Sequence, residues 1–141
     1  MTIVAAIDDI EGTDRIVSEA WALAERFDEP LHVVFVYRKS EHSHLANQYM
    51  NISKSISEEQ ATELAERVVA DAVEGITDEY EAVGRVGDPA DEIVAYAAEV
   101  DARYVVVGGR PRSPVGKAVF GSVSQSVLLE ADCPVLSVQS G

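Results

Sequence analysis

The sequence has very little cysteine and no long apolar run. A single cysteine, Cys133, excludes an intrachain disulfide and fits a reducing compartment, so we expect a cytoplasmic protein. No stretch approaches the roughly 20 apolar residues of a membrane-spanning helix. The N-terminus turns acidic at Asp8 and Asp9 and has no basic start, unlike a signal peptide. These absences exclude secreted disulfide scaffolds and argue against a membrane partner.

Basic residues are also scarce, and they are unevenly placed. Eleven Lys and Arg stand against 25 Asp and Glu, a net charge of −14. Residues 1–101 hold 23 acids and 7 bases (net −16), whereas residues 102–141 hold 2 acids and 4 bases (net +2). So negative a chain is not expected to bind nucleic acid or an anionic membrane, which are polyanions. The acid excess fits a halophilic, high-salt cytosol, or an ordinary acidic protein that its charge keeps soluble.

Hydrophobic residues, at 47% of the chain, are sufficient for the core of one domain over residues 1–141. Apolar runs predict strands at 2–7, 31–37, 80–86, 104–107 and 134–138, and helical periodicity predicts helices around 16–27, 57–73, 88–97 and 122–129. Residues 38–56 are polar and aperiodic, so we expect a long connection there. Alternating strands and helices predict an α/β fold: a doubly wound, five-stranded parallel sheet with helices on both faces.

The loop over residues 107–124 is the strongest candidate for chemistry. It joins a predicted central strand to the start of a helix, and it contains four glycines and three cations. Free N–H groups and the dipole at a helix start favour an anion, so the loop is a candidate phosphate cradle. The alternative is a Gly/Pro-rich turn in which Ser122 only caps the helix, in a capping box with Gln125.

Two common phosphate motifs are excluded. The Walker A pattern needs four residues between its glycines, but six separate Gly109 from Gly116, and Ala118 replaces the hydroxyl that would hold Mg²⁺. The glycine-rich dinucleotide fingerprint is absent after the first strand, which runs into Asp8 and Asp9.

Motifs along nearly the whole chain resemble the universal stress protein family. They are Asp8, the turn at 87–89, the run 105–108, the helix start at 121–124 and the segment 131–135. The nucleotide-binding branch of that family carries Gly, two residues, Gly, nine residues, then Gly-Ser/Thr. Gly108 and Gly121-Ser122 match this pattern in type and spacing, whereas Pro111 takes the place of the second glycine. Proline has no N–H to donate to a phosphate.

The resemblance implies a sheet in the order 3-2-1-4-5 and a site between strands 1 and 4 for ATP or a related adenine nucleotide, with or without Mg²⁺. It implies that Ala6, Ile7 and Asp8 meet the adenosine half, that Val36 and Val107 line the base pocket, and that Gly108, Gly121, Ser122, Val123 and Ser124 hold phosphates. Arg110, Arg112, Ser113 and Lys117 are the alternatives for replacing the phosphate contact that Pro111 loses. It also implies a homodimer that pairs through Val135–Val138.

We therefore expect a regulatory stress protein that binds nucleotide without turning it over, because the phosphate loop offers no general base and no catalytic triad can be assembled. The alternatives are a member that has lost nucleotide and acts through protein partners, and a weak ATPase. The pair Asp8-Asp9 also resembles phosphoacceptor receiver domains, but no lysine follows Val138. His42 and His44 lack further Cys or His ligands for a metal site, so they are expected in a solvated loop.

Overall fold

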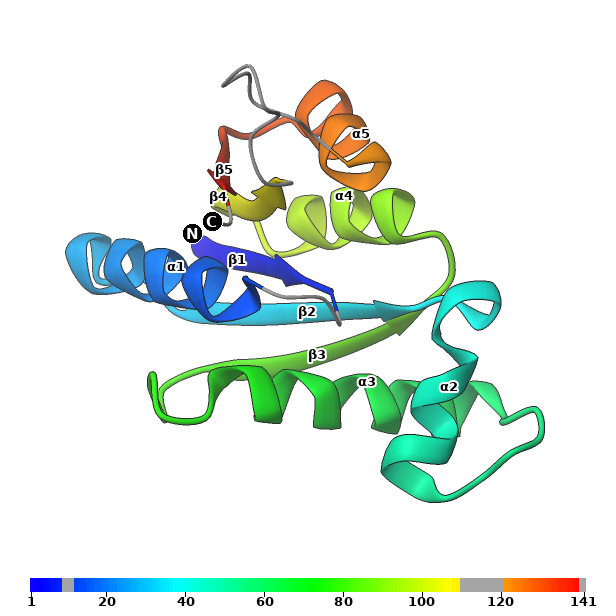
Figure 1. Ribbon diagram of the computed structural model, residues 1–141. Helices are drawn as coiled ribbons and strands as arrows, with labels where there is room; N and C mark the ends of the chain where they lie inside the picture. Colours follow the sequence, from blue (N-terminus) through cyan, green and yellow to red (C-terminus); the bar gives the residue numbers. More distant parts are fainter. Residues whose placement is uncertain (9–11, 110–120, 140–141) are drawn as a thin grey trace, which may run out of the picture.

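The computed structural model describes residues 1–8, 12–109 and 121–139 (Figure 1). Their elements, in chain order, are β1 (Thr2–Ile7), α1 (Thr13–Phe27), β2 (Leu31–Tyr37), α2 (Lys39–Met50), α3 (Glu58–Val73), β3 (Glu81–Val86), α4 (Pro89–Glu99), β4 (Ala102–Gly109), α5 (Ser122–Glu130) and β5 (Val135–Gln139). The predicted alternation of strands and helices is confirmed, with α2 as one additional helix.

The five strands form one parallel sheet in the order β3-β2-β1-β4-β5, as the family resemblance implied. The central strand β1 pairs with β2 on one side and β4 on the other, and Ala5 lies opposite both Val33 and Val106. The chain first builds outward to β3 and then returns through α4 to β4 on the far side of β1. The strand order therefore reverses between β1 and β4, and their carboxyl ends diverge into a crevice where ligands bind in such sheets.

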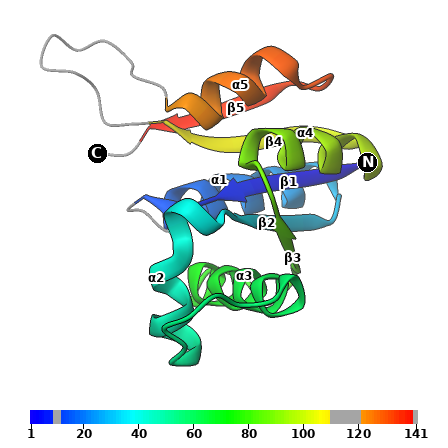
Figure 2. The same cartoon turned by 90° about the vertical axis from the view of Figure 1, so that its right-hand side faces the viewer.

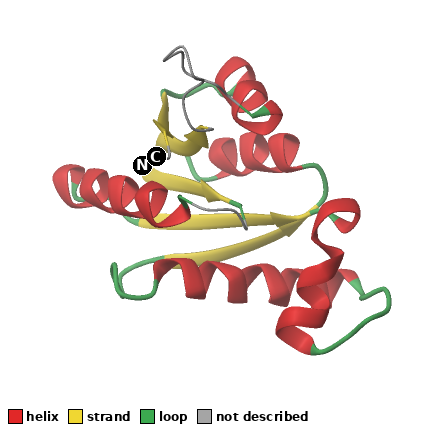
Figure 3. Ribbon diagram, viewed as in Figure 1, coloured by secondary structure: helices red, strands yellow, loops and turns green. Residues whose placement is uncertain are grey.

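Two apolar cores cover the two faces of the sheet, because successive strand residues point to opposite sides. Ile3, Ala5 and Ile7 of β1 pack with residues of α1, α2 and α3. Val4 and Ala6 pack with residues of α4 and α5. Figure 3 shows the yellow strands flanked by the red helices, and Figure 2 shows α2 beside α3.

The expectation of a long connection over residues 38–56 is wrong, because α2 occupies Lys39–Met50. Its buried residues are His42, Leu45 and Ala46. They follow the helical spacing i, i+3, i+4, but one of the three is a histidine. The helix ends at Asn51, whose φ of 55° is left-handed, a conformation that asparagine tolerates better than most residues. Because the buried stripe of this helix has only three residues and one of them is polar, its hydrophobic periodicity is too weak to predict a helix.

Two other helices begin where the sequence predicts them, at side-chain caps. Ser57 forms a capping box: its Oγ accepts the Gln60 N–H at 3.1 Å, and the Gln60 Oε1 accepts the Ser57 N–H at 2.9 Å. Asp88 caps α4 by accepting the Asp91 N–H at 3.1 Å, and Pro89 is the first residue of the helix. The latter cap fixes where α4 begins, and that helix start borders the crevice between the strand ends.

Candidate functional site

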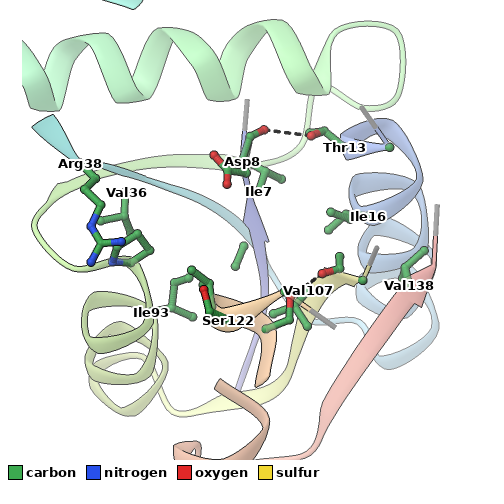
Figure 4. A pocket seen from close by; sticks show the side chains of 18 of the residues that line it. Ile7, Asp8, Thr13, Ile16, Val36, Arg38, Ile93, Val107, Ser122 and Val138 are labelled. Carbon is green, nitrogen blue, oxygen red and sulfur yellow. Dashed lines mark hydrogen bonds between the residues drawn. The ribbon is translucent and has the colours of Figure 1, made fainter. Parts of the chain in front are cut away.

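A pocket opens at the carboxyl ends of β1, β2 and β4 (Figure 4). Its walls include every predicted site residue that the structure describes: Ala6, Ile7, Asp8, Val36, Val107, Gly108, Gly121, Ser122, Val123 and Ser124. The predicted residues Arg110 and Arg112, and the departure from the motif at Pro111, lie outside the described residues. Residues that are far apart in the sequence therefore meet at the point where the strand order reverses.

One part of the pocket wall is apolar and continuous with a core of the protein. Ala6, Val36 and Val107, from three adjacent strands, are each no more than 7% exposed and belong to the core beneath α4. Ile93 of α4 completes this wall. Such a surface suits a flat, weakly polar ring, because burying the ring there displaces water from apolar surface.

A second part of the pocket wall is the first turn of α5. The predicted capping box of Ser122 with Gln125 is wrong: the cap residue is Gly121, with φ −74° and ψ 164°, and it makes no side-chain cap. Ser122 is instead the first residue inside the helix. The N–H groups of a first helical turn have no partner within the helix, and this end of the helix dipole is positive. The wall therefore has the polarity that an anion needs.

Gly108 and Ser124 join the end of β4 to α5. The Ser124 hydroxyl donates a hydrogen bond to the Gly108 carbonyl, and Ser124 is only 7% exposed. A Cβ on Gly108 would lie 2.7 Å from the Cδ1 of Ile16, a distance that real contacts do not show. Both residues thus have a structural task at the pocket wall, in addition to the phosphate contact predicted for them.

Asp8 has a partner that sequence reasoning missed. The Nε2 of His42 lies 3.1 Å from the Asp8 Oδ1, and the Thr13 hydroxyl donates to the Asp8 backbone carbonyl at 3.0 Å. His42 is 3% exposed, so the expectation that it lies in a solvated loop is wrong. Leu45 and Ala46, three and four residues later, are the sequence signal that could have placed it on a buried helix face.

The rim of the pocket carries a cation that was also missed. The guanidinium of Arg38, after β2, donates to Asp88 at 2.6 Å and to Glu41 at 3.1 Å. Arg38 and Glu41 both line the pocket. These contacts join the end of β2 and the start of α2 to the cap of α4.

The described part of the chain offers no protein-only metal site, since no three of its His, Cys, Asp or Glu side chains come together. Nor does any helix in the described ranges have the length and apolar character needed to cross a membrane.

The sequence and the fold both match known proteins. The family model described as "Universal stress protein family" matches residues 1–139. The chain belongs to the universal stress protein family. This universal stress protein is 32% identical over 138 residues to the "Universal stress protein in QAH/OAS sulfhydrylase 3'region" of Thermus aquaticus, with 98% of each chain covered. The matches to three other curated relatives span 46%, 40% and 65% of their lengths, less than two thirds of each.

Solved structures of other universal stress proteins share the fold. One from Archaeoglobus fulgidus is 28% identical with a TM-score of 0.62, over 97% of each chain. Another from the same organism, in complex with dAMP, is 24% identical with a TM-score of 0.58 and covers 97% of this chain and 96% of that one. At this identity the second match supports the fold alone.

Proposed function

We propose that this universal stress protein is a regulatory module that binds ATP or a related adenine nucleotide in the pocket between β1 and β4. One observation carries the proposal: the described residues predicted for nucleotide binding all line a single pocket. The ligand of one structural neighbour, dAMP, is of the same chemical class.

The two kinds of wall fit the two halves of such a ligand. The apolar wall of Val36, Val107 and Ile93 would take the base, and the first turn of α5 would take phosphate oxygens through its N–H groups. Mg²⁺ would arrive on the nucleotide phosphates, since the described residues offer no three-ligand cluster of their own. The Arg38 guanidinium stands at the rim, where Asp88 and Glu41 offset its charge, so the attraction for the phosphates is assigned to the first turn of α5.

Binding without turnover is part of the proposal. At the first turn of α5, the described wall presents glycine, serine and valine, with no carboxylate or imidazole that could activate water. Asp8 and His42 lie at the end of β1 and are hydrogen-bonded to each other. We assign Asp8 the task of orienting the nucleoside half of the ligand.

Calorimetric titration of Mg²⁺-ATP, ADP and AMP into the purified protein, at low and high salt, tests this function. We expect saturable heat and a matching rise in melting temperature. If millimolar nucleotide produces neither, the protein does not bind it, and the alternative of a family member acting through protein partners takes its place. Sustained phosphate release that is lost in Asp8→Ala would instead establish a weak ATPase.

We also propose a homodimer that pairs through β5. This strand stands at one edge of the sheet, where its outer hydrogen-bonding groups face no other strand of the described sheet. Leu136 on β5 and Leu129 near the end of α5 are 38% and 77% exposed. Leu136→Asp should convert the dimer to a monomer in light scattering. Ala70→Asp, at an exposed position of α3, which packs on β2 and β3 toward the other edge of the sheet, should not. An unchanged mass for Leu136→Asp would place the interface elsewhere.

A further inference from the structure

His42 is a buried ionisable side chain at the edge of the pocket. Its ring lies between two aromatic rings of β2, with centroids 4.9 Å from Phe35 and 5.9 Å from Tyr37. Only 3% of its surface is exposed. Because the imidazole is buried between these rings, each of its nitrogens needs a hydrogen-bond partner in the protein. A buried nitrogen without a partner would lose its hydrogen bond to water with no compensation.

The two ring nitrogens have different partners. The backbone N–H of Arg38 points at Nδ1, with an N···N distance of 2.8 Å. Because that N–H is a donor, Nδ1 must accept, and in a neutral imidazole the proton then sits on Nε2. Nε2 lies 3.1 Å from the Asp8 Oδ1, so its N–H donates to the carboxylate.

These contacts give each nitrogen its own task. Nδ1 satisfies the N–H of Arg38, the residue that caps α2, and so helps to fix the start of that helix. Nε2 holds one oxygen of the Asp8 carboxylate, which is 47% exposed at the pocket. The bond reaches from α2 to the end of β1, across 34 positions of the sequence.

We propose that His42 is a positioning residue for nucleotide binding. Through Nε2–H it sets the Asp8 carboxylate as an acceptor for hydroxyl or amino donors of the nucleoside, and it thereby couples α2 to the ligand. This inference rests on the proposed function, because it assigns to Asp8 the nucleoside half of the ligand. It adds α2, a helix that the sequence pattern does not predict, to the elements that bind the nucleotide.

Two substitutions separate the two tasks. His42→Asn carries an amide oxygen near the place of Nδ1, so it keeps an acceptor for the Arg38 N–H but is too short to reach Asp8. His42→Gln carries an amide nitrogen near the place of Nε2, so it keeps a donor to Asp8. Ser40→Ala, at an exposed position of the same helix outside the pocket lining, is the control.

We expect the affinity for Mg²⁺-ATP to fall about tenfold in His42→Asn, because a hydrogen bond to a charged group is lost. The affinity should stay within about threefold of wild type in His42→Gln and Ser40→Ala. Melting temperatures of the same four proteins, measured in parallel, show whether a loss of affinity reflects a loss of stability. If His42→Asn and His42→Gln lose affinity equally, or if His42→Asn binds as well as wild type, the positioning role is wrong while the proposed function stands.

A second measurement needs no ligand. Nitrogen-15 NMR of the imidazole in the free protein should find the ring proton on Nε2 and a perturbed Nε2–H signal in Asp8→Ala. A proton on Nδ1 would overturn the inference whatever the titrations show. If wild type binds no nucleotide, the proposed function fails and this inference fails with it, an outcome distinct from the two above.

Discussion

Two glycines of the pocket wall, Gly121 and Gly108, are favoured for different physical reasons. Gly121 caps α5 with a φ of −74°, a backbone that any residue can adopt, so the backbone itself does not demand glycine. Under the proposed function, the reason for glycine here is space for the nucleotide phosphates. Gly108 leaves room for the end of the Ile16 side chain, which would have to move if a Cβ were added, with or without a ligand. The proposed function thus assigns glycine to binding at one position and to packing at the other.

Gly121→Val tests the first reason. A branched side chain at the start of α5 would intrude on the predicted phosphates, whereas valine suits the extended backbone of this cap residue. We expect titration calorimetry to detect no nucleotide binding and the melting temperature to stay close to that of wild type. Gln125→Val, an exposed position in the same helix, is the control and should bind normally. Wild-type affinity in Gly121→Val would place the phosphates elsewhere.

Gly108→Ala tests the second reason. The new methyl would lie 2.7 Å from the Ile16 Cδ1, so the end of that side chain must move. We expect a loss of about 1 kcal/mol of unfolding free energy, the low end for overpacking, because only a terminal methyl group has to shift. Ile16→Val removes that Cδ1, so Gly108→Ala should cost less in the Ile16→Val background than in wild type. Urea unfolding of the four proteins measures the difference. An equal cost in both backgrounds would show that contact with Ile16 is not the cause.

At the scale of elements, sequence patterns predicted what depends on local, strongly patterned residues. Five apolar runs gave the strands, and the short-range partners of Ser57 and Asp88 gave two helix starts. Helix α2 was missed because its buried stripe includes His42, whose burial depends on Asp8 from a distant strand. Ser124 shows the same limit, since its hydroxyl turns to the Gly108 carbonyl. Contacts between elements cannot be read from local spacing.

The residues of the candidate site also fall into those that the sequence could predict and those that it could not. The wall residues could be named from a resemblance, since family motifs specify positions on strands and helix starts. The supporting contacts could not, because Arg38 reaches Asp88 across 50 positions and His42 reaches Asp8 across 34. Both contacts depend on parallel strands placing the residues after their carboxyl ends at one edge of the sheet.

An ion cluster links elements at the opposite edge of the sheet. Glu29, before β2, accepts from the Arg103 guanidinium of β4 at 2.8 Å and lies 3.3 Å from the N-terminal amine of Met1. The hydrogen bond from Arg103 lowers the pKa of Glu29 below its ordinary value, although partial burial opposes it. A carboxyl with a lowered pKa in the folded state stabilises the fold above its unfolded pKa, and that stabilisation is lost as the pH falls through the folded pKa.

Glu29→Gln should therefore be less stable than wild type at pH 7, and this difference should shrink as the pH falls below the ordinary pKa of about 4.5. Urea unfolding between pH 7 and pH 3.5 measures it. Glu25→Gln, on the exposed surface of α1, removes the same charge without removing the Arg103 contact. A difference that stays constant across this pH range would mean that the ion cluster does not contribute to stability.

At the scale of the whole molecule, a net charge of −14 acts on a chain of 141 residues, and residues 1–101 alone carry −16. Repulsion among these carboxylates opposes the compact state, and the ordered ion pairs of Arg38, Arg85 and Arg103 offset it only locally. Dissolved salt screens the repulsion, since the Debye length falls from about 10 Å at 0.1 M to about 3 Å at 1 M. Added salt should therefore stabilise the folded state of this acidic chain by weakening the repulsion among its carboxylates.

We expect the melting temperature to rise with KCl and to gain most of its increase below about 1 M, where the Debye length is changing fastest. Sucrose, which stabilises by exclusion from the surface and screens no charge, should give a rise without this early plateau. Calorimetric scans across both series distinguish the two mechanisms. A melting temperature that climbs steadily up to several molar KCl would indicate salt exclusion from the surface, and one that falls would mean that attractive ion pairs outweigh the repulsion.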